Sequence, residues 1–253
     1  MDPGWPEFVR QTQARTPARL LQGRVGACYR TATQLDLRRD HAAARDAVRT
    51  ELDIAKQLGA EFVHKWRLFE VATQAASKDQ YLLDPRLGRT FSDSARRELM
   101  EHCSTDLDLQ IAIGDGLSVA AIESQVPHLL PLLCEGAAAQ AWSVGRSFVI
   151  RHCRVGILNE IGELLRPGVI VLLIGERPGL ATAESLSAYL AYRPNRSHTD
   201  ADRNLVSNIH RRGVSHQAAA QQILSLAANM MACGLSGTKL KPGPDLLSVN
   251  SGS

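Results

Sequence analysis

The spacing of hydrophobic positions predicts two different parts in this chain. In the first hundred residues, apolar side chains recur at intervals of three and four, which is typical of helices. Val48, Leu52 and Ala55 show this spacing, and Gly59 offers a helix end. The predicted helices cover residues 31–58, 61–74 and 94–103, and a loop rich in turn residues is predicted for 77–89.

After residue 105 the pattern changes to short apolar runs separated by helical stretches. The runs predict strands at 148–151, 169–174 and 186–192, and residues 107–113 alternate between apolar and polar positions, which predicts a further strand. The predicted helices are one from a Ser118 cap to about residue 123, a second that Pro127 opens, one at 157–165 that Pro167 stops, and one at 215–233 with Gly234 as its cap. Such alternation favours parallel strands joined by right-handed crossovers.

The predicted fold class is therefore α/β, with a helical N-terminal part followed by a doubly wound, mostly parallel sheet of the Rossmann or flavodoxin-like type. We divide the chain into a flexible N-terminal arm, a helical region, an α/β domain and a disordered tail. These segments cover residues 1–30, 31–104, 105–238 and 239–253. The arm is basic and punctuated by proline and glycine, which suits a segment that wraps a partner.

Composition narrows the function classes. The net charge is +3, the Lys and Arg residues are scattered, and aromatic residues make up 5%, so no nucleic-acid surface is predicted. No apolar run approaches the roughly 18 residues of a membrane span, and no signal peptide is evident. The five cysteines are far apart and lack zinc-site spacing, which favours reduced thiols in a soluble, cytoplasmic protein with no structural metal.

Three short segments that follow predicted strands are the best candidates for a ligand site. They are Asp115-Gly116, Arg154-Val155-Gly156 and Gly175-Glu176-Arg177. If the strands are parallel, these segments meet at one edge of the sheet, where open α/β sheets bind ligands. Glu176 could accept hydrogen bonds from a ligand's amides, or it could pair with a neighbour and hold the turn. Asp115 and Glu176 could also serve as acid and base in a free-standing enzyme.

The sequence motifs in and around these segments, in their order and spacing, resemble those of the ethanolamine ammonia-lyase light-chain family. The likeness covers nearly the whole chain after about Gln22. The matching motifs are Ser77-Lys78-Asp79, Tyr81-Leu82, Gly88-Arg89, Asp115-Gly116-Leu117-Ser118, Arg154-Val155-Gly156, Ile161-Gly162-Glu163, Gly175-Glu176-Arg177-Pro178-Gly179-Leu180, Ala201-Asp202-Arg203 and Ser207-Asn208-Ile209-His210.

The resemblance implies a small subunit of an adenosylcobalamin-dependent lyase that converts ethanolamine to acetaldehyde and ammonia. It implies a hetero-oligomer in which a large subunit, a TIM barrel, runs the radical steps. The cofactor would lie between the two chains with its own dimethylbenzimidazole on cobalt. Enclosure in a bacterial microcompartment is an open alternative for its location. No catalytic residue and no protein ligand to the metal is expected in this chain.

By the family pattern, three positions would contact the cofactor: Val155, Glu176 and Leu205. Many relatives carry Cys where Leu205 stands, so a backbone contact stays possible there but a thiol role does not. The segment Asn208-Ile209-His210 resembles part of the D-x-H-x-x-G motif in which histidine ligates cobalt, but Asn208 replaces the orienting aspartate and disfavours that role for His210. A non-catalytic cobalamin-binding or microcompartment adaptor is the alternative function.

Overall fold

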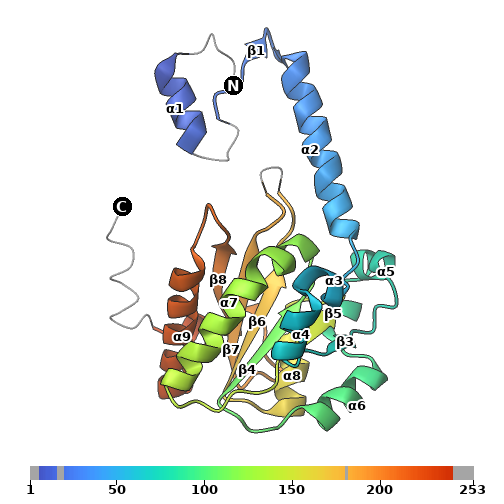
Figure 1. Ribbon diagram of the computed structural model, residues 1–253, viewed down its shortest axis with the longest axis vertical. Coiled ribbons are helices and arrows are strands. Elements are labelled where there is room, and N and C mark those ends of the chain that lie inside the picture. Colours follow the sequence, from blue (N-terminus) through green and yellow to red (C-terminus); the bar gives the residue numbers. More distant parts are fainter. Residues whose placement is uncertain (1–5, 16–19, 180–181, 242–253) are drawn as a thin grey trace.

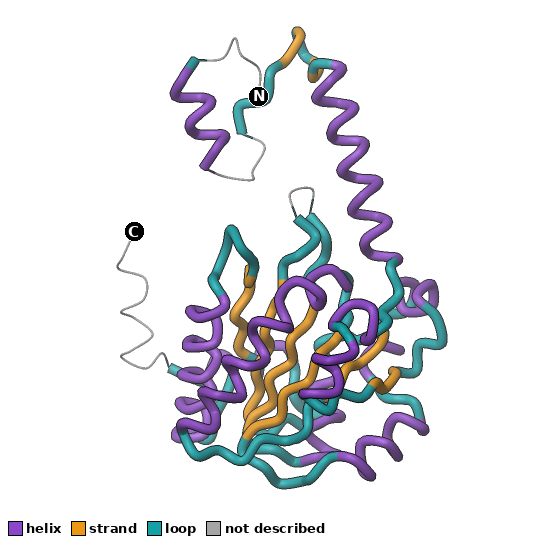
Figure 2. Tube along the Cα trace, viewed as in Figure 1, coloured by secondary structure: helices purple, strands orange, loops and turns teal. Residues whose placement is uncertain are grey.

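The computed structural model describes residues 6–15, 20–179 and 182–241. Within these residues, one six-stranded sheet forms the centre of the molecule, and helices cover both of its faces (Figures 1 and 2). The strands of this sheet are β3 Glu70–Ala72, β4 Leu109–Gly114, β5 Phe148–Arg151, β6 Val169–Gly175, β7 Leu186–Tyr192 and β8 Asn204–Ile209. The architecture confirms the predicted α/β class.

The strand order is β3-β5-β4-β6-β7-β8. The first four strands are parallel, whereas β7 pairs antiparallel with β6, and β8 antiparallel with β7. The connection from β4 leads outward to β5, and the connection from β5 leads back past β4 to β6. The chain therefore changes direction next to β4, and such a switch point opens a crevice at the carboxyl ends of the strands.

The helices have the bounds α1 Glu7–Arg15, α2 Thr31–Arg49, α3 Ile54–Leu58, α4 Ala60–Lys65, α5 Lys78–Leu83, α6 Asp93–His102, α7 Val119–Ala139, α8 Ile157–Leu165 and α9 His216–Cys233. Short 3-10 turns are η1 Leu87–Arg89, η2 Asp200–Asp202 and η3 Gly237–Lys239. A small hairpin, β1 Arg24–Val25 with β2 Cys28–Tyr29, precedes α2. None of the helices in the described ranges is long and apolar enough to cross a membrane.

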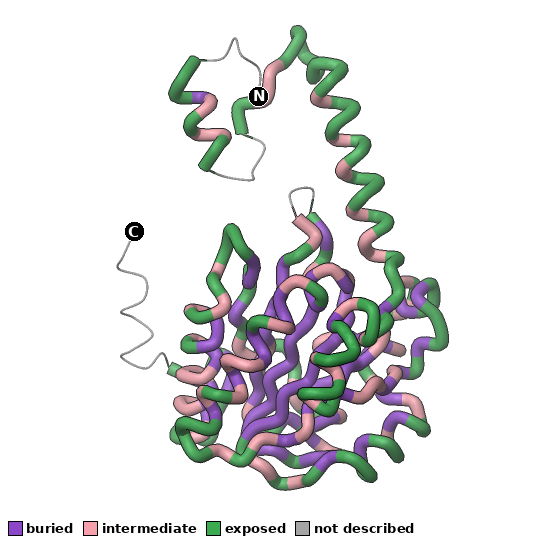
Figure 3. Tube along the Cα trace, in the orientation of Figure 1, coloured by how far each residue is buried: buried purple, intermediate pink, exposed green. Residues whose placement is uncertain are grey.

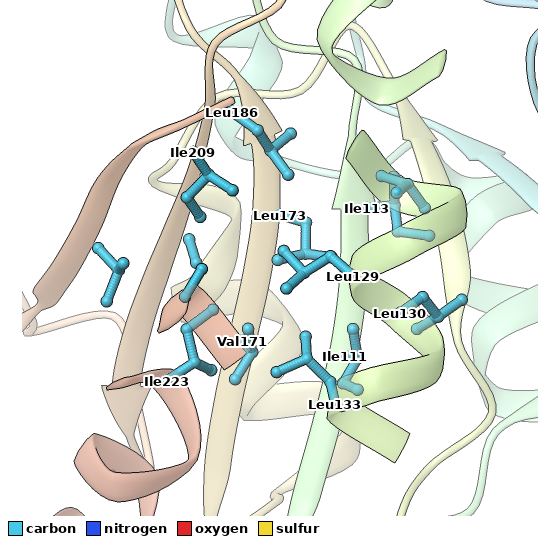
Figure 4. Packing of buried hydrophobic residues seen from close by; sticks show 14 of the residues in the cluster. Ile111, Ile113, Leu129, Leu130, Leu133, Val171, Leu173, Leu186, Ile209 and Ile223 are labelled. Atoms are coloured by element: carbon cyan, nitrogen blue, oxygen red, sulfur yellow. The ribbon is translucent and has the colours of Figure 1, made fainter. Parts of the chain in front are cut away.

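The sheet separates two hydrophobic clusters because successive side chains of a strand point to opposite faces. Ile111 and Ile113 of β4 belong to the cluster under α3, α7 and α9, whereas Ala112 between them belongs to the cluster under α6 and α8. Figure 4 shows the first cluster, in which Leu129 and Leu133 of α7 pack on these strands. The central strands β4 and β6 are buried on both sides, which explains the unbroken apolar run of β6, whereas β4 includes the buried polar residue Gln110.

Several predicted boundaries are confirmed, and others are wrong. The strands at 148–151 and 186–192, the helix at 157–165 and the αL cap at Gly234 agree with the structure. The predicted helix at 31–58 is instead two helices, because the Asp53 side chain accepts from the N–H groups of Ala55 and Lys56 and starts α3.

Three further predictions are wrong. Residues 70–72 form the edge strand β3 instead of continuing a helix, and residues 78–83 form α5, capped by Ser77, instead of a loop. Pro127 does not open a new helix, because α7 runs through it and through Pro131. Proline costs a helix interior about 3 kcal/mol, which the burial of the apolar residues of α7 against the sheet offsets.

The segment predicted as an arm contains α1 and the β1–β2 hairpin where it is described. From there α2 runs toward the sheet and reaches it only at its C-terminal end (Figure 1), and none of its residues is buried (Figure 3). Residues 1–5, 16–19 and 242–253 lie outside the described ranges, and with them most of the predicted tail. The division into four segments stays a prediction.

Candidate functional site

The three predicted loops meet at the carboxyl edge of the sheet. A pocket of about 390 Å³ opens there, lined by residues that follow β4, β5 and β6 and by side chains of β7 and β8. Val155, Glu176 and Leu205, the three residues predicted to contact a cofactor, all line this one pocket. We call it the edge pocket. They come from three separate parts of the chain, so their convergence is a property of the fold.

Two glycines bring the loops after β4 and β6 into contact. Gly116 has a φ of +55°, and a Cβ atom there would collide with the carbonyl oxygen of Gly175. Gly175 is equally confined, since its Cβ atom would collide with the carbonyl oxygen of Ser118. The N–H of Leu117 donates to the Gly175 carbonyl at 3.1 Å. The loop after β4 and the end of β6 are therefore in direct contact and form one wall of the pocket.

A buried ion pair lies beneath the edge pocket. The Asp115 carboxylate is fully buried and accepts from Lys78 Nζ at 3.2 Å and from the Cys153 N–H at 2.8 Å. The Tyr81 hydroxyl donates to the Cys153 carbonyl at 2.9 Å. We call these four residues, Lys78, Tyr81, Asp115 and Cys153, the floor. The floor ties α5 to the ends of β4 and β5.

The floor residues are held in their neutral or paired forms by burial. Desolvation, with the nearby charge of Asp115, raises the pKa of the Tyr81 hydroxyl, and burial likewise raises the pKa of the Cys153 thiol. Both oxygens of Asp115 accept hydrogen bonds and its side chain has no exposed surface. Asp115 therefore has no path to a substrate, which disfavours a free-standing enzyme that uses Asp115 and Glu176 as acid and base.

Glu176 sits differently, at the mouth of the edge pocket. Its Oε1 accepts from the Ser187 hydroxyl at 2.6 Å and from the Asn208 N–H at 3.0 Å. Burial raises the pKa of this carboxyl, but the hydrogen bonds from Asn208 and Ser187 outweigh it, so the pKa lies below the usual value. Glu176 is thus ionised at neutral pH. A carboxylate offers about four acceptor positions, so it retains capacity for a ligand's N–H groups.

Val155 and Leu205 give the pocket its apolar sides. Val155 is half-buried and packs against the cluster under α8. Leu205 lies opposite Tyr189 in the register of β8 with β7, and Leu205 is 46% exposed. Ser207, two residues further along β8, lines the same pocket, whereas Val206 between them is buried in the core. We call Val155, Glu176 and Leu205 the rim.

His210 lies outside the edge pocket, and both of its ring nitrogens form hydrogen bonds within its own loop. Nδ1 accepts from the Arg212 N–H at 3.2 Å, so the proton is assigned to Nε2, which donates to the Asn208 side-chain oxygen at 2.7 Å. The hydrogen bond to Asn208 thus holds the His210 imidazole against the turn that follows β8. Among the described residues, no group of three or more His, Cys, Asp and Glu side chains could hold a metal ion.

Lys78 and Tyr81 are the site residues that sequence reasoning missed. Both belong to motifs that carry the family resemblance, but the sequence predicts a loop at residues 77–89, because Pro85 and Gly88 are turn residues. The signal that could have placed them is Ser77, whose side chain accepts from the Gln80 N–H and starts α5.

Comparison with known proteins shows the family of this chain. The family model of the ethanolamine ammonia-lyase light chain (EutC) matches residues 6–241. The chain is 40% identical over 240 residues to the ethanolamine ammonia-lyase small subunit of Clostridium perfringens, covering 95% of this chain and 79% of that protein.

Two further relatives carry the same name. Identity is 41% over 235 residues with the protein of Clostridioides difficile, covering 93% of this chain and 78% of the relative. It is 38% over 240 residues with that of Listeria monocytogenes, covering 95% and 80%. Because these matches span almost the whole chain and most of each relative, the chain belongs to the ethanolamine ammonia-lyase small-subunit (light-chain) family.

Proposed function

We propose that this chain is the small subunit of an adenosylcobalamin-dependent ethanolamine ammonia-lyase and that the edge pocket binds the cofactor at the contact with a catalytic large subunit. The observation that carries the proposal is the convergence of Val155, Glu176 and Leu205 on one pocket. The complex would convert ethanolamine to acetaldehyde and ammonia. When bound, adenosylcobalamin supplies the radical that takes hydrogen from the substrate.

The donor set of the edge pocket fits a corrin, whose rim carries neutral amide side chains. Glu176 is ionised and already held by Ser187 and Asn208, so it can accept amide N–H groups without reorganising. Val155 and Leu205 supply apolar contact beside it. The floor beneath is held together by its own hydrogen bonds and gives the rim a fixed base.

The size of the pocket supports a shared site. Pockets of about 300–1,000 Å³ bury drug-sized ligands. The edge pocket, at about 390 Å³, falls in the lower part of that range, and a corrin cofactor is considerably larger than such ligands. This chain can therefore cover one part of the cofactor, and a second protein surface is needed for the rest. The exposed side chain of Leu205 is suited to that boundary.

No residue of the edge pocket is proposed as a catalytic acid, base or nucleophile. Asp115 is enclosed, and the Cys153 thiol is fully buried with a raised pKa, so neither is available for proton transfer or attack. His210 is engaged by Asn208 and Arg212, which supports a cofactor that keeps its own dimethylbenzimidazole on cobalt. The chain's part is to bind and orient the cofactor and to exclude water.

Reconstitution tests the proposal. The chain is co-expressed with an ethanolamine ammonia-lyase large subunit, and acetaldehyde release from the purified complex is assayed with and without adenosylcobalamin. We expect activity that requires both chains and the cofactor. A complex that binds cobalamin without turnover would favour the non-catalytic adaptor, and turnover by this chain alone would contradict the proposal.

A further inference from the structure

A second pocket continues from the edge pocket toward α2. It has a volume of about 440 Å³ and shares Leu117, Arg154 and Arg177 with the edge pocket. Its other wall is one face of α2, on which the lining residues recur at helical spacing: His41, Ala44, Arg45, Val48 and Arg49. We call this pocket the basic groove. Figure 1 shows α2 rising beside the loop that follows β6.

The basic groove is strongly one-sided in charge. Its lining includes four arginines and one histidine, and no carboxylate lines it among the described residues. Arg49 is neutralised in part by Asp79 at 2.7 Å. The side chains of Arg45 and Arg177 form no ion pair or hydrogen bond with the part of the chain that the structure describes. Two guanidinium groups are thus left for an external anion.

Arg154 lies between the two pockets and lines both of them. Its guanidinium lies 4.2 Å from the centre of the Tyr81 ring, and an amino group donates to the Tyr81 carbonyl at 3.4 Å. Stacking on a buried ring fixes the plane of the guanidinium before any ligand arrives. Arg154 contacts no carboxylate in the described ranges, so its charge also acts on the space between the pockets.

We propose that the basic groove is a phosphate-binding subsite, and that the phosphate it takes is the phosphodiester of the cofactor's nucleotide loop. The inference rests on the proposed function and extends it from the corrin to the anionic part of the same molecule. Glu176 presents an acceptor to neutral amides in one pocket, and Arg177, the next residue, lines the groove beside Arg45. Arginine pairs with phosphate oxygens through its planar fork of N–H groups.

A phosphate bound at the subsite would also stabilise the position of α2. None of its residues is buried, so packing within this chain contributes little to its position. A helix of this kind gains stability from a bound group that contacts it and the sheet edge together. The phosphodiester would bridge Arg45 on α2 and Arg177 on the loop after β6, and so close the groove over the edge pocket.

The test compares two corrinoids on the reconstituted complex. Adenosylcobalamin carries the nucleotide phosphate and adenosylcobinamide lacks it, so the ratio of their dissociation constants isolates the contribution of the nucleotide loop. The variant is Arg45→Gln/Arg177→Gln. The control is Arg97→Gln, on the exposed side of α6 and outside both pockets. Binding is followed by the absorption change of the corrinoid, without substrate.

We expect the double variant to weaken adenosylcobalamin binding by about tenfold or more, the scale of one or two charge-assisted hydrogen bonds, and to leave adenosylcobinamide binding within about twofold. Arg97→Gln should change neither. Added salt should weaken adenosylcobalamin binding more in the unaltered complex than in the double variant, because the groove is open to solvent.

Inorganic phosphate separates the two sources of this anion. Competition by phosphate in the unaltered complex, lost in the double variant, supports the subsite when the corrinoid ratio also changes. Phosphate competition with an unchanged ratio would assign the groove to free phosphate and overturn the cofactor assignment. A double variant that weakens both corrinoids equally, or weakens association with the large subunit instead, would also overturn it and favour an acidic segment of the partner.

Failure of the subsite and failure of the proposed function are distinguishable. If the unaltered complex binds neither corrinoid, the proposed function itself is wrong. If it binds both, and the double variant binds adenosylcobalamin as tightly as before, only the phosphate subsite is wrong. The melting temperature of each complex shows whether the variants assemble normally.

Discussion

The floor and the rim place carboxylates at the ends of neighbouring parallel strands, yet the two groups have opposite environments. Asp115 follows β4, has no exposed surface, and accepts from Lys78 and the Cys153 N–H. Glu176 follows β6, is only half-buried, and keeps acceptor capacity toward an open pocket. The first is committed to the fold, whereas the second is available to a ligand.

A structural and a functional carboxylate at a sheet edge are distinguished by their surroundings. Asp115 and Glu176 each follow a parallel strand, so this position alone does not tell a structural carboxylate from a functional one. What discriminates is whether water or a ligand can reach the group. The comparison predicts that changes in the floor mainly alter stability, whereas changes in the rim mainly alter the affinity for the cofactor.

The largest effect is expected from Lys78→Met. It removes the cation from a buried pair and leaves Asp115 charged and unpaired, which typically costs about 3–5 kcal/mol of unfolding free energy. Urea denaturation of the full chain measures this loss. Arg166→Met is the matched control, because it breaks an ion pair with Asp106 in which both side chains are exposed, and it should barely shift the midpoint.

A second variant tests whether the unpaired charge of Asp115 causes the loss of stability. Lys78→Met/Asp115→Asn removes both charges, so it should recover part of the lost stability. If Lys78→Met shifts the urea midpoint no more than Arg166→Met does, the floor is not the structural element that the comparison assumes. Failure of the double variant to recover any stability would locate the loss in packing around Lys78 rather than in the stranded charge.

The next effect is expected in the rim, where Glu176→Gln should weaken adenosylcobalamin binding to the complex by about tenfold. The amide retains an oxygen for Ser187 and Asn208 but loses the charge that strengthens bonds to ligand amides. The unfolding midpoint should change little. Glu98→Gln on α6, outside the pockets, is the control. A loss of stability with unchanged affinity would make Glu176 a turn-holding residue.

Sequence reasoning was most successful where the hydrophobic pattern is continuous. The buried strands β5 and β7 and the helices α8 and α9 follow from apolar runs, helical spacing and caps. Parallel pairing of β4, β5 and β6 then brings the three candidate loops to one edge, as predicted. This pairing places Val155 and Glu176 of the rim in one pocket, whereas Leu205 reaches the pocket from β8 through the antiparallel pairing of β7 with β8.

The rest depends on contacts that no local pattern contains. Strand β8 is short and polar, and its two buried residues, Val206 and Ile209, are three positions apart and do not follow the alternation of a strand, although β8 supplies Leu205 and Ser207 to the pocket. Lys78 is buried only because Asp115, 37 residues away in sequence, lies within reach of its amine. The antiparallel direction of β7 is set by its short connection from β6 rather than by its own composition.

A smaller effect on affinity is expected from Leu205→Ala. Because the side chain is already partly exposed, its truncation should change the unfolding free energy by less than about 0.5 kcal/mol. Loss of apolar contact should weaken cofactor binding about twofold to fourfold. Leu205→Cys, which retains part of the apolar side chain, should fall between. Leu83→Ala on the exposed side of α5 is the control, and equal effects of Leu205→Ala and Leu83→Ala would remove Leu205 from the rim.

The smallest effect concerns pH and the rim carboxylate alone. The pKa of Glu176 in the folded chain lies below its ordinary value of 4.5, because bonds from Asn208 and Ser187 outweigh desolvation. Its ionised form therefore stabilises the fold above the ordinary pKa, and this contribution is lost as the pH falls through the folded-state pKa. The stability difference between the unaltered chain and Glu176→Gln, measured by urea denaturation from pH 7 to pH 3, should shrink below 4.5. A difference that instead grows on acidification would mean that Glu176 is held protonated, and the rim would then donate rather than accept.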